Sequence, residues 1–365
     1  MNWNYTQPVD IIFGSGRISE LKHLINGAKH PLLVSDPYFV ENGFVNQIFS
    51  IIGGADLFSD ISPNPDISEV NKCSERIRAK GTDIIIALGG GSSLDLAKAA
   101  SIAVPDIAAF HGTGKDVPSE HIPIIAVPTT SGTGSEVTCV SVLTDRRTGK
   151  KAPIVSDSFY PKAALIDPEL TLSVPPHVTA STGIDVLCHA VEGYWSKGHQ
   201  SICDALAVHA IKTVFAYLPT AYREPENRFA REKLAEASVM AGLAFTLPKT
   251  TSSHACSFPL TSIYRIPHGE ACGLTLDFFA RVNAADSRTV ELAALLGYSG
   301  VDAFADAIDE LKKAIGLRTG LSDLHLTDEQ TVELVQLSHH PNLDNNPVKI
   351  TDEILFDLYE KLKNQ

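Results

Sequence analysis

Apolar and polar positions follow different patterns in the two halves of the chain. In the first half, short apolar runs typical of strands alternate with segments of helical periodicity, and this alternation predicts a parallel α/β sheet. Three runs are the clearest strands: 31–36, 82–88 and 121–127. The run 82–88 is strongly β-branched, which is typical of a strand buried on both faces of a sheet.

From about residue 175 onward, helical periodicity dominates. Segments 201–218 and 228–245 carry apolar stripes with polar backs, as helices that pack on a core do. Further helices are expected at 302–316, 328–337 and 352–363. The second half is therefore predicted to be all helical.

The length of 365 residues exceeds what one hydrophobic core usually supports, which favours two domains. We place the boundary at Val174-Pro175-Pro176, because consecutive prolines interrupt regular structure. The predicted fold is an α/β domain built on a parallel sheet, residues 1–175, followed by an all-α domain, residues 176–365.

The charge and cysteine content exclude several classes of partner. A net charge of −13 argues against nucleic acid and against an anionic membrane surface, because both bind basic proteins. It still allows a small anionic substrate in a locally positive pocket. Six cysteines without a C-x-x-C pair suit reduced thiols. With no signal-peptide pattern and no run of roughly 20 apolar residues, we expect a cytoplasmic protein that does not cross a membrane.

Two glycine-rich loops follow predicted strands in the first half. The strand 82–88 continues into Gly-Gly-Gly-Ser-Ser at 89–93 and then into a helical segment, whose N-terminal backbone N–H groups can bind phosphate. The strand 121–127 continues into the hydroxyl-rich loop 128–136. Either loop alone would be an ordinary turn, but together they predict a nucleotide or pyrophosphate site. Neither contains the Lys-Ser or Lys-Thr of a Walker motif, which disfavours hydrolysis of a nucleoside triphosphate.

An acidic residue, Asp36, ends the first of the predicted strands. Its carboxylate could accept hydrogen bonds from both ribose hydroxyls of an adenosine and would repel a 2′-phosphate, which favours NAD over NADP. An aspartate in front of Pro37 is equally suited to capping the next turn. Both interpretations stay open at this point.

The segment 183–194 carries candidate chemistry. It is expected to be helical, so Asp185 and His189, four residues apart, meet on one face. Two further histidines, His254 and His268, lie downstream in polar, glycine-containing surroundings. One carboxylate and three imidazoles would form a four-ligand site for a divalent metal. Taken singly, the pair is more typical of an ion pair, and the other two of hydrogen-bonded histidines.

Taken together, these segments resemble the iron-containing (group III) alcohol dehydrogenase family. The matching motifs run along most of the chain: Pro-Asn-Pro at 63–65, Gly-Gly-Gly-Ser-Ser-Leu-Asp at 89–95, Pro-Thr-Thr-Ser-Gly-Thr-Gly-Ser-Glu at 128–136, the segment 183–194, and Ile-Pro-His-Gly at 266–269. The resemblance implies an N-terminal dinucleotide-binding domain and a C-terminal helical domain, an architecture shared with dehydroquinate synthase. It also implies a cleft between them for NAD(P) and a divalent metal.

By the same resemblance, the metal ligands and catalytic centre are Asp185, His189, His254 and His268. Fe²⁺ is the implied metal and Zn²⁺ the alternative, because these ligand types suit both. The implied cofactor contacts are Asp36, Asn64, Gly90, Gly91, Ser92, Asp95, Thr129, Thr130, Thr133 and Lys151. Lys151 is placed only by its distance before Asp167. The family also implies a homo-oligomer, here expected to be a dimer.

One position departs from the family pattern. Many members carry a second histidine four residues after the third ligand, where this chain has Phe258. A proton relay through that side chain cannot operate, so water or a ribose hydroxyl of the cofactor would carry the proton. In the implied reaction the metal acts as a Lewis acid and the nicotinamide carries the hydride.

Hydroxyl groups and cations near the candidate ligands indicate the substrate. Lys249 and the hydroxyls of residues 250–253, Thr251 and Ser252 among them, precede His254 at a predicted helix start, which suits an anionic group. Arg265 could add a second positive charge. The surrounding sequence is similar to the phosphonate-metabolism branch of the family, which leads to the hypothesis that phosphonoacetaldehyde is reduced to 2-hydroxyethylphosphonate. A capped helix with a solvated lysine is the plainer explanation.

Three alternative functions remain at this point. The first is a simple primary alcohol or diol dehydrogenase of the same family. The second is a lyase of the dehydroquinate synthase kind, which would require several basic residues around a carboxylated ring substrate and would regenerate its cofactor. The third is a nucleotide-binding protein without catalysis.

Overall fold

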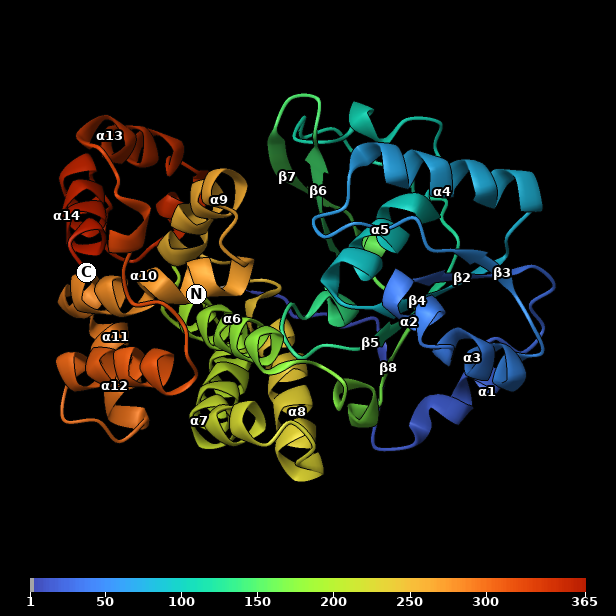
Figure 1. The fold of residues 1–365 in the computed structure, drawn as a ribbon, viewed down its shortest axis with the longest axis horizontal. Helices are drawn as coiled ribbons and strands as arrows, with labels where there is room; N and C mark the ends of the chain where they lie inside the picture. Colours follow the sequence, from blue (N-terminus) through green and yellow to red (C-terminus); the bar gives the residue numbers. More distant parts are fainter. Residues whose placement is uncertain (1–2) are drawn as a thin grey trace. The chain divides into compact units, whose positions relative to one another are not determined.

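The computed structural model describes residues 3–365, and the contacts within it divide the chain into two compact units (Figure 1). The sheet unit comprises Thr6–Thr130 and Gly134–Leu172. The helical unit comprises Ser173–Gln365 together with the short segments 3–5 and Ser131–Thr133. The boundary between residues 175 and 176 stays a prediction, and the contacts change unit between Leu172 and Ser173.

The sheet unit is built on six parallel strands in the order β1-β8-β5-β4-β2-β3. Their bounds are Asp10–Phe13 (β1), Pro31–Ser35 (β2), Asp56–Phe58 (β3), Ile84–Gly89 (β4), Ile124–Pro128 (β5) and Ala163–Ile166 (β8). The predicted parallel sheet is confirmed, and all six residues of β4 are buried, as its β-branched run predicted. Because successive side chains point to opposite faces, Ile85 and Ala87 pack in one core cluster while Ile84 and Ile86 pack in another.

Helices cover both faces of this sheet. One face packs against α4 (Ile67–Lys80) and α5 (Gly91–Ser101), and the other against α1 (Leu21–Leu24) and α3 (Phe44–Ile52). A hairpin that the sequence did not predict joins β6 (Val140–Asp145) antiparallel to β7 (Lys150–Val155). The remaining short elements are α2 (Pro37–Glu41), η1 (Arg17–Glu20), η2 (Ile107–Ala109), η3 (Ser135–Val137), η4 (Asp157–Phe159) and η5 (Pro168–Thr171).

The helical unit is organised around α6 (Pro176–Trp195), in which every residue from Gly183 to Trp195 is buried. A helix buried on all sides must pack neighbours on all sides. The helices that pack on it are α7 (Ser201–Arg223), α8 (Arg228–Phe245), α9 (Ser252–Tyr264), α10 (His268–Val282) and α11 (Ser287–Leu295). The other elements of the unit are α12 (Val301–Ala314), α13 (Asp328–Leu337), α14 (Asp352–Lys363), η6 (Asn283–Ala285), η7 (Ser322–Leu324) and η8 (Pro341–Asn345). The predicted helical second half is confirmed.

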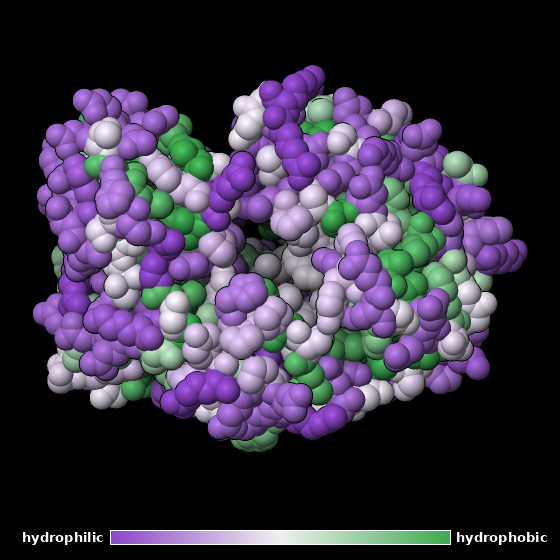
Figure 2. Space-filling model, viewed as in Figure 1, coloured by the Kyte–Doolittle hydropathy of each residue, from purple (hydrophilic) through white to green (hydrophobic). Residues whose placement is uncertain are grey.

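The surface of the helical unit is mainly hydrophilic on the face shown in Figure 2, with apolar patches scattered among polar residues. In the described chain, α7 is the one helix long and apolar enough to cross a membrane. It carries the buried residues Cys203, Ala207 and Ile211 toward its neighbours α6 and α8, as a core helix does. We therefore describe α7 as part of the core of this unit.

Candidate functional site

Three ionisable side chains lie along one face of α6. Asp185, His189 and Glu192 are three or four residues apart, so helical geometry places them one above the other. All three are buried, with exposed fractions of 3%, 6% and 0%. Polar groups buried in this way are costly unless they are paired or bind a ligand. Three buried ionisable groups on one helix face therefore indicate a ligand-binding site, because an ordinary core surface is apolar.

Two further helices bring histidines to this face. His254 lies in the first turn of α9, and its Nε2 is 3.6 Å from Oδ1 of Asp185. His268 begins α10, and the centroids of the His254 and His268 rings are 5.5 Å apart. The next residue, Gly269, explains the close approach, because a Cβ there would lie 1.9 Å from the backbone oxygen of Ser181 on α6. Residues far apart in the sequence thus converge at Asp185.

His189 lies beside this group. Its Nδ1 is 4.0 Å from Oδ1 of Asp185, and its ring is 4.6 Å from that of His254. The ring also stacks on Phe245 at 4.1 Å. Burial, with a smaller contribution from the His254 charge, holds the pKa of His189 well below its usual value, so the imidazole is neutral, the form that binds metals. Within residues 3–365, its buried Nδ1 has no hydrogen-bond partner.

The sequence did not anticipate Cys272. One donor atom each from Asp185, His254, His268 and Cys272 lies within 4.8 Å of the others, a set that does not include His189. The Cys272 sulfur is 3.9 Å from Nε2 of His268. Burial raises the pKa of the Cys272 thiol well above its usual value, which keeps the thiol neutral. The available signal was its position four residues after His268, on the same face of α10.

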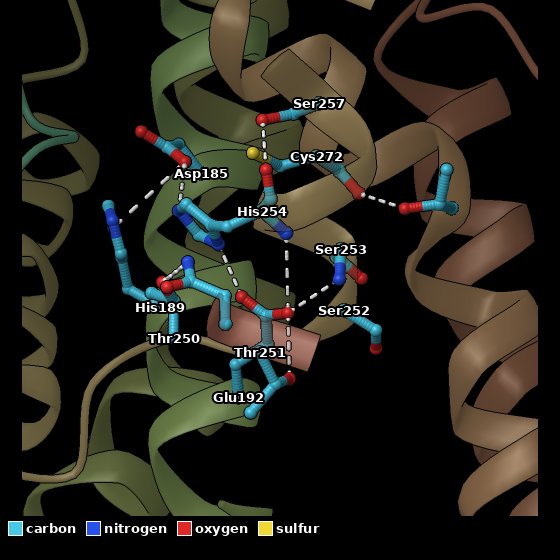
Figure 3. Close-up of polar contacts among 12 residues, drawn as sticks. Asp185, His189, Glu192, Thr250, Thr251, Ser252, Ser253, His254, Ser257 and Cys272 are labelled. Carbon is cyan, nitrogen blue, oxygen red and sulfur yellow. Dashed lines mark hydrogen bonds and ion pairs between the residues drawn. The ribbon is translucent and has the colours of Figure 1, made fainter. Parts of the chain in front are cut away.

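The chemistry of these donors fits a divalent metal. A carboxylate and neutral imidazoles are ligands that suit Fe²⁺ and Zn²⁺. An otherwise unsatisfied, buried His189 nitrogen beside a carboxylate is a further sign that a cation belongs here. Figure 3 shows how Asp185 and His189 of α6 lie against His254 of α9.

The N-terminus of α9 binds a carboxylate of the protein itself, that of Glu192 on α6. Oε1 of Glu192 accepts hydrogen bonds from the backbone N–H of Ser253 at 2.7 Å and from Oγ1 of Thr251 at 2.9 Å (Figure 3). Ser252 is fully buried and donates to Oδ1 of Asn346 at 3.1 Å. The sequence suggested that these hydroxyls and this helix start bind a substrate anion. In the structure they bind Glu192 and Asn346.

The other expected substrate residues lie around the same helix. Lys249 is exposed, and its backbone N–H donates to the carbonyl of Phe245, the residue that stacks on His189. Arg265 is exposed at the C-terminal end of α9. Phe258 is half-buried, with its ring 6.4 Å from that of His268 and 4.7 Å from that of His340. His340, on the loop before η8, was not anticipated.

In the sheet unit, the two glycine-rich loops lie side by side. The backbone N–H of Thr129 donates to the Gly89 carbonyl at 3.0 Å, and a Cβ on Gly90 would lie 3.2 Å from Oγ1 of Thr130. Gly91 begins α5 and Gly90 is its N-cap residue, so this N-terminus has no side-chain cap. Unsatisfied N–H groups at a helix start suit a phosphate.

Three more of the expected cofactor residues meet beside these loops. Nζ of Lys151 donates to Oδ1 of Asn64 at 2.8 Å, and the Asn64 backbone N–H donates to Oγ of Ser92 at 3.3 Å. Asp36 caps α2 by accepting from the Tyr38 N–H at 2.9 Å, as its capping interpretation predicted. Thr133 belongs to the segment that groups with the helical unit.

Asp95 has a structural environment. It accepts hydrogen bonds from Oγ of Ser135 at 2.6 Å and from the N–H of Val142 at 2.9 Å, so it connects α5 to the second loop and to β6. Lys98, one turn later and 1% exposed, donates to Ser135 at 2.8 Å and to the Val140 carbonyl at 3.0 Å. Burial lowers the pKa of Lys98 to about 8. Lys98 was not predicted as a site residue, although its three-residue spacing from Asp95 places the two side chains on one face of a helix.

Comparison with known proteins extends these observations to the whole chain. Residues 8–168 match the family model described as iron-containing alcohol dehydrogenase, and residues 179–363 match the C-terminal model of the same family. The crystal structure of sulfoacetaldehyde reductase from Bifidobacterium kashiwanohense in complex with NAD⁺ is 58% identical, with a TM-score of 0.97 and full coverage of both chains.

Two curated proteins are more distant relatives. The 1-propanol dehydrogenase PduQ of Salmonella typhimurium is 33% identical over 96% of each chain. Sulfoacetaldehyde reductase of Bilophila wadsworthia is 33% identical over 84% of this chain and 86% of its own.

Proposed function

Because the chain belongs to the iron-containing alcohol dehydrogenase family, we propose that it reduces a short aldehyde bearing a sulfonate group, with NADH as the hydride donor. The observation that carries this substrate class is the 58% identity, over the full length of both chains, with a sulfoacetaldehyde reductase bound to NAD⁺. In the balanced reaction, sulfoacetaldehyde, NADH and one proton give 2-hydroxyethanesulfonate and NAD⁺.

Phosphonoacetaldehyde, the substrate predicted from the sequence, is the second candidate. It has the same two-carbon aldehyde skeleton with a phosphonate in place of the sulfonate. The sulfoacetaldehyde reductase relatives favour an anionic aldehyde of this size without testing the phosphonate itself. Lys249, exposed before the first turn of α9 that carries His254, is the cation we assign to the anionic group, whereas Arg265 lies at the opposite end of this helix.

We assign the metal to Asp185, His189, His254 and His268, with Fe²⁺ as the metal. When bound there, the metal supplies a Lewis acid that polarises an aldehyde carbonyl. The buried neutral ring of His189 is ready to bind without first losing a proton, and Asp185 supplies the negative charge that the imidazoles lack. Cys272 stays a neutral thiol at the edge of this group.

We assign the cofactor to the loops of the sheet unit. The uncapped N-terminus of α5 at Gly90 and Gly91 would bind the pyrophosphate, and Thr129 and Thr130 line the neighbouring loop. Asn64, Ser92 and Lys151 form one hydrogen-bonded group beside it. Bound NADH supplies the hydride, and the chain supplies its orientation.

The proton that completes the alcohol needs a source other than Phe258, which has no titratable group. Its ring packs against the rings of His268 and His340, and thus forms an apolar wall next to a proposed ligand. Solvent water or a ribose hydroxyl of the cofactor would deliver the proton.

A substrate comparison tests this function. Anaerobically purified, Fe²⁺-loaded protein is assayed with NADH and sulfoacetaldehyde, phosphonoacetaldehyde or propanal at the same concentrations. We expect kcat/KM for sulfoacetaldehyde to exceed that for propanal by about tenfold or more, the value of one charge-assisted contact. Equal values would exclude an anionic substrate and favour a simple alcohol dehydrogenase. A higher value for phosphonoacetaldehyde would select the second candidate.

The same assay distinguishes the proposed reductase from a lyase of the dehydroquinate synthase kind. A reductase consumes one NADH for each alcohol formed, whereas a synthase of the dehydroquinate kind regenerates its cofactor. Stoichiometric loss of NADH absorbance with alcohol formation is therefore the expected result. Turnover without net NADH loss would contradict the proposed function.

A further inference from the structure

We propose that Glu192 is the positioning residue that fixes the ring orientation and the proton of His254, a role that rests on the proposed metal site. Glu192 is on α6 and is 0% exposed, and its Oε2 is hydrogen-bonded to Nδ1 of His254 (Figure 3). A carboxylate only accepts hydrogen bonds, so Nδ1 must carry the proton. Nε2 then presents its lone pair, and this atom is the one that lies 3.6 Å from Oδ1 of Asp185.

The carboxylate is itself held in a single orientation. Its Oε1 accepts from the N–H groups of Ser253 and His254, at 2.7 and 3.4 Å, and from Oγ1 of Thr251 at 2.9 Å. Nε1 of Trp195 in turn donates to Thr251 at 2.9 Å. Because both oxygens have donors from fixed, fully buried groups, rotation of the carboxylate would break several hydrogen bonds at once.

Capping α9 does not by itself explain this arrangement. Helix N-termini are usually capped by a side chain at the cap position, yet Thr251 at that position makes no cap hydrogen bond to its own helix. Its hydroxyl points to Glu192, which lies 59 residues earlier in the chain. A carboxylate from α6 caps α9 and also contacts the imidazole, so it couples the two helices that carry Asp185 and His254.

The three proposed histidine ligands differ in the groups to which their rings are hydrogen-bonded. His189 has a hydrogen bond to the backbone of Gly132. His268 has a long contact of 3.4 Å between its Nδ1 and Oγ of Ser257. His254 is hydrogen-bonded through Nδ1 to the carboxylate of Glu192. Such a partner orients a ligating imidazole and raises its basicity, and its loss weakens metal binding by about 10–100-fold.

Cobalt(II) binding to the apoprotein tests this role without substrate or cofactor. Glu192→Gln keeps the size of the side chain and can still accept from Ser253, but its NH₂ group would face Nδ1 and force the proton onto Nε2. We expect the affinity for Co²⁺, measured by chelator competition, to fall by about 10–100-fold, with a shifted visible ligand-field spectrum. The matched control is Glu333→Gln, an exposed position on α13, which should leave both unchanged.

The experiment distinguishes failure of the proposed metal site from failure of the proposed role of Glu192. Wild-type protein that binds neither Co²⁺ nor Fe²⁺ would overturn the metal site and the proposed function together. Wild-type binding with an unchanged Glu192→Gln affinity and spectrum would overturn the role of Glu192 alone. If circular dichroism shows that Glu192→Gln does not fold, Thr251→Val serves instead, because it removes one donor and leaves the carboxylate in place. A loss of about fivefold, the value of one hydrogen bond, supports the role, and an unchanged affinity overturns it.

Discussion

The two units of this enzyme build their sites from different materials. In the sheet unit, the candidate cofactor site consists of backbone N–H groups at the start of α5 and a second loop beside it. In the helical unit, the candidate metal site consists of side chains from α6, α9 and α10, of which Asp185, His189 and His254 are buried and His268 is half-buried. The first depends mainly on the path of the chain, and the second on the identity of single residues.

This difference predicts how the two sites respond to substitution. A site made of backbone donors loses only a part of its contacts when one side chain is shortened, because the N–H groups remain. A metal site loses a ligand outright, and the charge and geometry of the remaining ligands no longer match the ion. Changes in the helical unit should therefore be severe and specific, and changes in the loops of the sheet unit graded.

The largest effect is expected from His254→Ala. Removal of this proposed ligand should lower kcat/KM by about 10³-fold or more, since a Lewis-acid metal contributes several kcal/mol to the transition state. Iron content after anaerobic purification should fall in parallel. His177→Ala, at an exposed position on the same helix as Asp185, is the control that should retain both. A His254→Ala protein with full iron content and activity would show that His254 is not a metal ligand, and that the helical unit does not depend on this single side chain.

Much of this contrast was visible in the sequence. The alternation of apolar runs and helical segments predicted the parallel sheet and the all-helical second half, because burial and period are local properties. The spacing of Asp185 and His189 predicted their common face for the same reason. The glycine-rich loops predicted a phosphate site, since a strand, a glycine turn and a helix start make one continuous unit.

What the sequence did not reveal depends on contacts between distant segments. Glu192 was part of a quoted motif, but its partners Thr251, Ser253 and His254 lie about 60 positions away and are brought to it only when α9 packs on α6. The approach of α10 depends on Gly269 in its first turn, where the absence of a side chain matters only because the backbone of Ser181 lies against it. The β6–β7 hairpin has no strong period-2 signal.

The stability of the sheet unit should depend on pH through one buried carboxyl group, that of Glu136. Glu136, 3% exposed at the end of the second loop, has its pKa raised to about 7 by burial, from a usual value of 4.5. The folded state therefore binds this proton more tightly, so its stabilising effect is complete below pH 4.5 and is lost as the pH rises to about 7. Glu136→Gln should remove this contribution, which is on the order of 1–3 kcal/mol.

Urea unfolding of the apoprotein at pH 5 and pH 7 measures this effect. The fall in unfolding free energy between the two pH values should be smaller in Glu136→Gln than in the wild type. Glu120→Gln, at an exposed position in the same unit, should keep the wild-type fall. An identical fall in wild type and Glu136→Gln would show that Glu136 does not titrate in this range.

The substrate side of the metal site should respond less strongly than its ligands. Lys249→Gln preserves the length of the side chain and the left-handed backbone at this position, where φ is 65°, but removes the charge. We expect kcat/KM for sulfoacetaldehyde to fall by about five- to tenfold, the value of one exposed charge-assisted contact, with the value for propanal unchanged. The control is Lys349→Gln, also exposed. An equal loss for both aldehydes would instead show that Lys249 has a structural role and does not contact the anionic group of the substrate.

The smallest effect is expected where the backbone does most of the binding. Ser92→Ala removes the hydroxyl that accepts the Asn64 N–H at 3.3 Å, but it leaves the N–H groups at the start of α5 in place. The KM for NADH should therefore rise only about three- to fivefold, with kcat and iron content unchanged, because one hydrogen bond contributes about 1 kcal/mol. Ser50→Ala on the exposed side of α3 is the matched control. If Ser92→Ala were as damaging as His254→Ala, the cofactor site would depend on single side chains as the metal site does, and the distinction between a backbone site and a side-chain site would not hold.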